Sequence, residues 1–79
     1  MKTRVIVKLK NGVLDPQGKA VQQAAATLGF VEASDIRVGK VFEIEWDGHD
    51  QRGAKEKLEQ LGNKLLANTV IEKFEIEIL

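Results

Sequence analysis

The chain has 79 residues and no cysteine, and its 12 basic and 12 acidic side chains balance to a formal net charge of zero. This length allows one domain, residues 1–79, with a thin margin of stability, so burial by a partner would stabilise it. The charge balance argues against strong binding to nucleic acid or to an anionic membrane, and the missing cysteine excludes disulfides and thiolate sites. Because the opening MKTRVIVKLK lacks an apolar signal-peptide core and no segment could span a bilayer, we expect a cytoplasmic protein.

The first predicted element is a strand over residues 4–10, where charged and apolar side chains alternate. Its inward side would carry Val5, Val7 and Leu9. The pair Asn11-Gly12 then predicts a turn.

A helix is predicted to begin at Pro16 and to end at Gly29. Asp15 can cap the free amides at its start, and proline at the first helical position loses no hydrogen bond. Glycine is typical of the position just after a helix. One narrow face would let this helix lie close to a sheet, because its side chains are small or apolar: Ala20, Val21, Ala24, Ala25 and Leu28.

The stretch from Ile36 to Trp46 alternates again, but Lys40 interrupts its apolar parity. A lysine on the core-facing parity beside Gly39 indicates a bulge or a tight hairpin, so the stretch is one bent strand or two short strands, and a break is favoured. Trp46, at the end of this stretch, is either buried or an interface anchor.

Asp50 can cap a second helix, in which Gly62 costs about 1 kcal/mol relative to alanine unless close packing requires it. The apolar stripe of that helix would be Ala54, Leu58, Leu61 and Leu65. The last predicted strand covers residues 70–79, with an inward side made of Phe74, Ile76 and Ile78.

This order of elements predicts an α+β fold, a ferredoxin-like β-α-β(β)-α-β sandwich with a three- or four-stranded sheet and two helices on one face. The outer sides of the strands add a topological prediction. The first strand is basic there, whereas the middle stretch carries Glu43 and Glu45 and the last strand carries Glu75 and Glu77. Since opposite charges across a ladder stabilise it, the first strand should lie between the other two, as in the strand order 4-1-3-2.

No residue set forms a recognisable catalytic, cofactor-binding or metal site. His49 has no second histidine to share a metal, and Ser34 lacks the flanking glycines of a nucleophile elbow. The outer glutamates are explained by a salt-bridged sheet surface. The glycines near residues 12–18 lack the spacing of phosphate-binding loops, and Phe42 and Phe74 fall on the core parity rather than on a base-stacking face.

Three segments of the sequence resemble the PurS family. They are VKLKNGVLDPQGKA at residues 7–20, DIRVGK at residues 35–40 and LLANTVIE at residues 65–72. Their order and spacing match the family's, and the likeness spans nearly the whole chain. Asn11 and Thr69 stand where relatives often have proline, which should loosen two local turns.

The resemblance implies a role in assembly. Members of the family are small, non-catalytic subunits of phosphoribosylformylglycinamidine (FGAM) synthase, an ATP- and glutamine-dependent C–N ligase of purine biosynthesis. Such a chain would bridge the glutaminase and synthetase subunits so that ammonia passes between them, and it would form a homodimer or a homotetramer. It would hold no cofactor itself, because ATP and Mg are used elsewhere in the complex.

We expect contacts with the other subunits at exposed strand edges and at loops that include residues 12–18 and 38–40. The candidate contact residues are Gly12, Leu14, Asp15, Gln17, Gly18, Val38, Gly39, Lys40 and Asn68.

Two other classes of function stay open. A ferredoxin-like ligand-sensing regulatory module would bind a small molecule saturably as an isolated chain. An independent enzyme of acylphosphatase type would turn over substrate alone, although its phosphate-cradling arginine loop has no counterpart in residues 11–18.

Overall fold

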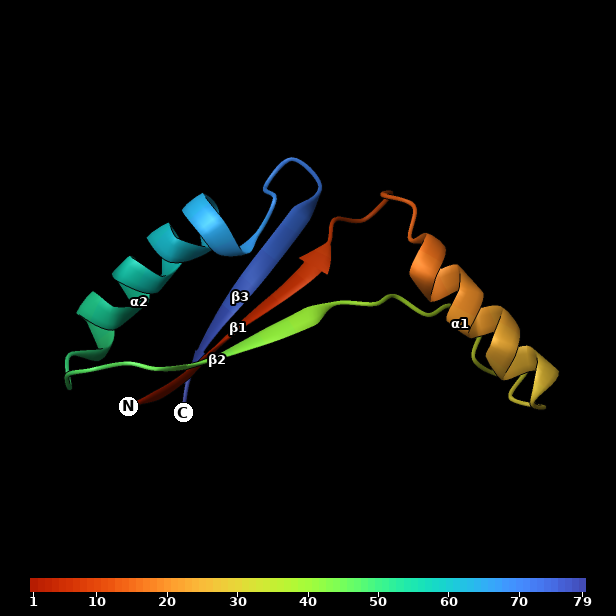
Figure 1. The fold of residues 1–79 in the computed structure, drawn as a ribbon, viewed down its shortest axis with the longest axis horizontal. Helices are drawn as coiled ribbons and strands as arrows, with labels where there is room; N and C mark the ends of the chain where they lie inside the picture. Colours follow the sequence, from red (N-terminus) through yellow and green to blue (C-terminus); the bar gives the residue numbers. More distant parts are fainter.

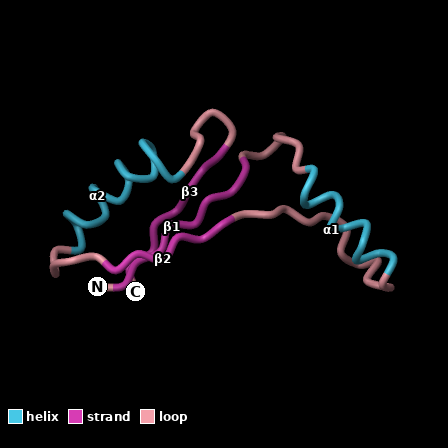
Figure 2. Tube along the Cα trace, viewed as in Figure 1, coloured by secondary structure: helices cyan, strands magenta, loops and turns pink.

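The computed structural model describes the whole chain, residues 1–79, as three strands and two helices, the second of which ends in a π-helical turn. Figures 1 and 2 show one sheet with a helix along it and a second helix that extends away from it. In chain order the elements are β1 (Lys2–Leu9), α1 (Pro16–Thr27), β2 (Lys40–Glu45), α2 (Gln51–Leu61), η1 (Gly62–Leu66) and β3 (Glu72–Ile78).

The three strands form an antiparallel sheet in the order β2-β1-β3, so the predicted central position of the first strand is confirmed. The register carries the charge pattern on which that prediction depended. Arg4 stands opposite Glu43 of β2 and opposite Glu77 of β3, with 4.0 Å between its Nη1 atom and the Glu77 Oε1 atom. The expected small α+β fold is therefore present, with three strands.

The core lies on one face of this sheet, between β1 and α2. Val5, Val7, Leu58 and Ala67 form its buried centre. The buried Thr3 hydroxyl donates to the Ile44 carbonyl at 2.8 Å, so this polar group is satisfied. Partly buried apolar residues surround the centre: Phe42, Ile44, Trp46, Leu61, Leu66, Phe74 and Ile76.

Helix α2 begins as predicted, because the Asp50 carboxylate accepts from the Gly53 amide at 3.2 Å. The predicted apolar stripe is wrong at Leu65, whose side chain is 73% exposed. The cause is the π-helical turn, in which the Ala67 amide donates to the Gly62 carbonyl at 3.0 Å. This wider turn contains one residue more than an α-turn, so Leu66 and Ala67 reach the core instead.

Two glycines are required by close packing. A Cβ atom at Gly62 would lie 2.6 Å from the Phe74 ring, so glycine lets the helix approach β3. A Cβ atom at Gly39 would lie 2.6 Å from the Val7 carbonyl oxygen. The predicted interruption at Gly39 is present, but the expected second short strand is not: residues 36–39 lie outside the sheet and β2 begins at Lys40. The Lys40 ammonium lies over the Phe42 ring at 5.6 Å from its centroid.

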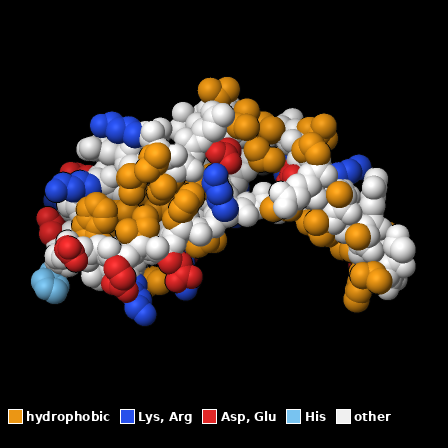
Figure 3. Space-filling view, in the orientation of Figure 1, with side chains coloured by type: hydrophobic (Ala, Val, Ile, Leu, Met, Phe, Trp, Pro, Cys, Tyr) orange, Lys and Arg blue, Asp and Glu red, His pale blue; other side chains and the backbone are white.

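The prediction of two helices on one face is wrong for α1. Only α2 lies along the sheet, whereas α1 projects beyond its end and gives the molecule dimensions of 47 × 25 × 14 Å (Figure 1). The reason is local: the start of α1 is hydrogen-bonded to the segment just before β2. We call residues 11–39 the arm. Apolar side chains remain on its surface (Figure 3), including Val21, which is 45% exposed, and Leu28, which is 76% exposed.

Strand β3 is shorter than the predicted residues 70–79, because a turn occupies the positions before Glu72. The amides of Ile71 and Glu72 both donate to the Asn68 carbonyl, at 3.0 and 2.7 Å. Val70 is consequently 82% exposed at the tip of this turn.

Candidate functional site

Asp15 joins the two predicted contact loops at the base of the arm. Its Oδ1 atom accepts from the Gly18 amide at 2.8 Å, which caps α1, and its Oδ2 atom accepts from the Val38 amide at 2.7 Å. The residue is only 7% exposed. Two segments separated by 23 residues in sequence are therefore held side by side by one carboxylate.

The same junction depends on glycine at position 18. Gly18 is buried, and the place that a Cβ atom would take is occupied by the Ile36 carbonyl oxygen. Because glycine has no side chain, α1 can approach the backbone of residues 36–39 directly. The sequence predicted a helix start at this position, but it gave no sign of this contact.

Hydrogen bonds from the Gly18 and Val38 amides lower the pKa of Asp15 below its usual value of 3.8, and nearby Arg37 lowers it further. Arg37 also makes a second tie across the base of the arm, since its Nη2 atom donates to the Lys10 carbonyl at 3.2 Å. With both carboxylate oxygens occupied, Asp15 is suited to fixing a loop rather than to transferring protons.

A hollow of about 350 Å³ opens beside this junction, on the face of the sheet that carries the core. We call it the inner hollow. Five predicted contact residues line it, namely Asp15, Gln17, Val38, Gly39 and Lys40, together with Val7, Leu9 and Glu72. The structure thus brings together residues from all three sequence segments, since Glu72 is the last residue of the third.

Glu72 is a member of this site that the sequence reasoning missed. Its Oε1 atom accepts from the Asn68 amide at 2.6 Å, so Asn68 positions it from the adjacent turn. The available signal was an acidic residue on the inward parity of the last strand, where Phe74 and Ile76 follow. Asn68 itself does not line the inner hollow; its side chain accepts from the Val70 amide at 3.2 Å and stabilises the turn.

Three other predicted contact residues do not line the inner hollow: Gly18, which is buried in the junction itself, Gly12 and Leu14. Gly12 has a φ of +85° in the turn after β1, a conformation that suits glycine. Leu14 is 77% exposed, although it is apolar. Gly12 and Leu14 are both exposed. Contact of either residue with another subunit stays a prediction.

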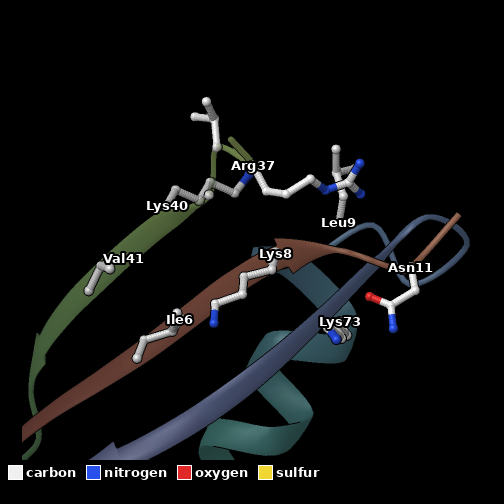
Figure 4. A pocket seen from close by; sticks show the side chains of 10 residues that line it. Ile6, Lys8, Leu9, Asn11, Arg37, Lys40, Val41 and Lys73 are labelled. Carbon is white, nitrogen blue, oxygen red and sulfur yellow. The ribbon is translucent and has the colours of Figure 1, made fainter. Parts of the chain in front are cut away.

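A second hollow, of about 490 Å³, lies on the opposite, open face of the same end of the sheet. We call it the basic hollow. Figure 4 shows Lys8, Lys73 and Arg37 around it, with Ile6 on β1 and Val41 on β2. No carboxylate lines this hollow. Besides the five residues just named, its lining contains Leu9, Asn11, Val38, Gly39 and a third lysine, Lys40.

The one histidine, His49, and the one serine, Ser34, line neither hollow. The chain contains no group of three or more histidine, cysteine, aspartate or glutamate residues that could hold a metal ion. His49 is exposed in the turn before α2, and Ser34 is exposed with its carbonyl bonded to the Gln22 side chain. No helix has the length and the apolar content that crossing a membrane would require.

Comparisons with known proteins agree with the three sequence segments. The family model "PurS: Phosphoribosylformylglycinamidine (FGAM) synthase" matches residues 2–79. The chain is 43% identical over 77 residues to the phosphoribosylformylglycinamidine synthase subunit PurS of Bacillus subtilis, with 98% of this chain and 90% of the relative covered.

Solved structures give the same result. PurS from Methanocaldococcus jannaschii, described as one of the subunits of formylglycinamide ribonucleotide amidotransferase in the purine biosynthetic pathway, superposes with a TM-score of 0.86. It is 39% identical, and 96% of this chain and 92% of that one are covered. The structure of PurLQS from Thermotoga maritima shares the fold, with a TM-score of 0.89, 24% identity and coverage of 99% and 95% of the two chains. The chain therefore belongs to the PurS family of FGAM synthase subunits.

Proposed function

We propose that this chain is the non-catalytic small subunit of an FGAM synthase and that it bridges the glutaminase and the ATP-dependent synthetase. Ammonia released from glutamine would then reach the synthetase and be used to make formylglycinamidine ribonucleotide in purine biosynthesis. Membership of the PurS family supports the assignment, together with the description of the Methanocaldococcus relative as one subunit of an amidotransferase.

The observation that carries the proposal is how the loops of residues 12–18 and 38–40 are built at one end of the sheet, which we call the loop end. Asp15 uses both carboxylate oxygens to fix backbone, and Gly18 and Gly39 allow backbone to pack where a side chain would collide. Such a site presents a rigid shape and exposed main chain to another protein. Both oxygens of Asp15 already accept backbone hydrogen bonds, which supports a structural role for it.

The proposal also covers the cofactors and the oligomeric state. ATP and Mg would be bound by other subunits of a cytoplasmic complex. A homodimer or homotetramer would cover apolar side chains on the arm, such as Val21 and Leu28, and would protect the free outer edges of β2 and β3.

The experiment is reconstitution from the purified chain, synthetase and glutaminase, with FGAM formation followed from glutamine and, separately, from ammonia. We expect glutamine-dependent synthesis to require this chain and ammonia-dependent synthesis by the synthetase to proceed without it. Equal glutamine-dependent rates with and without the chain would reject the bridging role. Saturable binding of a small metabolite by the isolated chain, without assembly, would favour the ligand-sensing alternative instead.

A further inference from the structure

The open face of the sheet, which neither helix covers, has two ends of different electrostatic character. At one end the cross-strand neighbours have opposite charges: Lys2 faces Glu45, and Arg4 faces Glu43 and Glu77. At the loop end, Lys8 of β1 stands directly opposite Lys73 of β3. Like charges in this position destabilise a ladder, so the isolated chain carries a cost there.

The basic hollow lies at this like-charged end (Figure 4). Lys8, Lys73 and Arg37 line it, and the hydrogen bond from Arg37 to the Lys10 carbonyl holds the guanidinium at its edge. Lys40 also borders the hollow, but its ammonium lies over the Phe42 ring, so we do not count it among the charges offered there.

Lys8 and Lys73 form no ion pair within 4.0 Å, and Arg37 lies near Asp15 without forming one. The single ion pair within 4.0 Å is that between Arg4 and Glu77, at the other end of the face. The nearest acid along the ladder, Glu75, stands opposite Ile6 and does not line the hollow. What distinguishes this end of the face is a lining with lysine and arginine but no carboxylate, next to two lysines that stand directly opposite each other.

Two other occupants fit these observations less well. A second copy of the chain would offer acids of this face, but three of the four, Glu43, Glu45 and Glu77, already stand opposite cations of β1, which leaves only Glu75. A small anion is usually held by buried donors aimed into its site, and here no buried side-chain nitrogen or oxygen lacks a partner. Carboxylates on a protein surface match exposed lysine side chains better.

We propose that the basic hollow is the docking site for an acidic segment of another subunit of the synthase. Aspartate or glutamate side chains of that segment neutralise Lys8, Lys73 and Arg37, and its apolar side chains lie against Ile6 and Val41. This inference rests on the proposed function. The pair of Lys8 and Lys73 would then contribute to association, because charges at the rim of an interface steer the encounter and fix the register of the two partners.

The test uses Lys8→Gln, Lys73→Gln, the double variant and Lys73→Glu, with Lys57→Gln on the exposed side of α2 as the matched control. In the isolated chain at low salt, removing one lysine of the pair should raise Tm by about 1 to 4 °C. Lys73→Glu should raise it more, because it creates an attractive pair with Lys8. Lys57→Gln should leave Tm unchanged.

In the reconstituted complex the order reverses. Each neutral variant at position 8 or 73 should weaken assembly about two- to fivefold and the double variant roughly tenfold. Lys73→Glu should weaken it further, Lys57→Gln should bind like the unmodified chain, and high salt should remove the differences. More stable chains that assemble less well are not expected from a merely structural role.

The possible failures are distinguishable. If the unmodified chain does not assemble with the other subunits, the proposed function fails. If it assembles and the variants assemble equally well, only the docking proposal is overturned. Two results would overturn it and also identify another occupant. If the variants assemble normally and millimolar inorganic phosphate raises the Tm of the unmodified chain alone, the hollow is a small-anion site. If the variants assemble normally but change the oligomer size of the chain, the hollow contacts a second copy.

Discussion

The two helices of this small protein are held in different ways. Helix α2 lies along the sheet and buries Ala54 and Leu58, so burial of apolar area within one chain stabilises it. Helix α1 buries only Gly18, and two hydrogen bonds at the base of the arm hold it in place: Asp15 accepts from the Val38 amide, and Arg37 donates to the Lys10 carbonyl. One half of the molecule therefore resembles an ordinary folded domain, whereas the arm has its position fixed but its apolar surface left uncovered.

The largest expected effect is in the sheet half. Leu58→Ala should lower the free energy of unfolding by about 2 to 5 kcal/mol, because it removes a side chain that has no exposed surface. Urea denaturation measures the change, and Leu65→Ala is the control. The exposed Leu65 should cost less than about 0.5 kcal/mol. Equal losses at the two positions would contradict the register set by the π-helical turn.

Gly62→Ala tests the close approach of α2 to β3. The added methyl group would lie 2.6 Å from the Phe74 ring, and overpacking of this kind costs about 1 to 3 kcal/mol. Denaturation of the single variant and of the double variant Gly62→Ala/Phe74→Leu measures the effect. The smaller side chain at position 74 should restore part of the loss. A stabilising Gly62→Ala would show that helix propensity outweighs packing here.

Asp15→Asn should loosen the arm while the sheet half stays intact. The amide side chain offers one oxygen where the carboxylate offers two, so the Gly18 and Val38 amides cannot both keep their bonds. Hydrogen exchange should accelerate in residues 11–39 and stay unchanged around Leu58. The control Asp50→Asn should affect only the start of α2. Uniform acceleration across both halves would reject the separation of the molecule into two regions.

Lowering the pH should also loosen the arm, because it protonates Asp15. The pKa of Asp15 is lower in the folded chain than the usual 3.8, so its contribution to stability is fully present above that value and is lost as pH falls through the folded pKa. The protection factor of the Val38 amide, which corrects for the intrinsic pH dependence of exchange, should fall in the native chain as pH is lowered. In Asp15→Asn it should show no such step.

The smallest effect on the isolated chain is expected at the surface of α1. Leu28→Gln changes a side chain that is 76% exposed and should alter the free energy of unfolding by less than about 0.5 kcal/mol. If oligomerisation covers this surface, the same change should shift sedimentation toward smaller species. Thr27→Gln, beside it, is the control. Identical sedimentation of all three chains would leave the arm uncovered in solution.

The sequence predicted best where periodicity and charge act along a strand. Opposite charges on β1, β2 and β3 correctly placed β1 in the centre, and Asp15 and Asp50 correctly marked both helix starts. It failed where position depends on contacts distant in sequence. The small face of α1 looks the same whether it covers its own sheet or projects beyond it, and the Val38 amide gives no local sign that it bonds to Asp15.

The candidate site was predictable in part for the same reason. The loops of residues 12–18 and 38–40 were found because they lie in segments that resemble the PurS family, and five of their residues line the inner hollow. Glu72 was missed, because its role depends on a turn that brings Asn68 beside it. The opposition of Lys8 and Lys73 requires the register of β1 and β3, which periodicity alone cannot give.

The bond between Asp15 and Val38 has a consequence for how the chain tolerates changes in length. It joins two residues 23 positions apart at the base of the arm, and all three strands lie outside the segment that it closes. Since the entropy of closing a loop varies slowly with its length, residues 19–35 can gain or lose turns of helix at little cost to the rest. The reach of the arm is therefore adjustable by insertion or deletion, while the sheet and both hollows keep their shape.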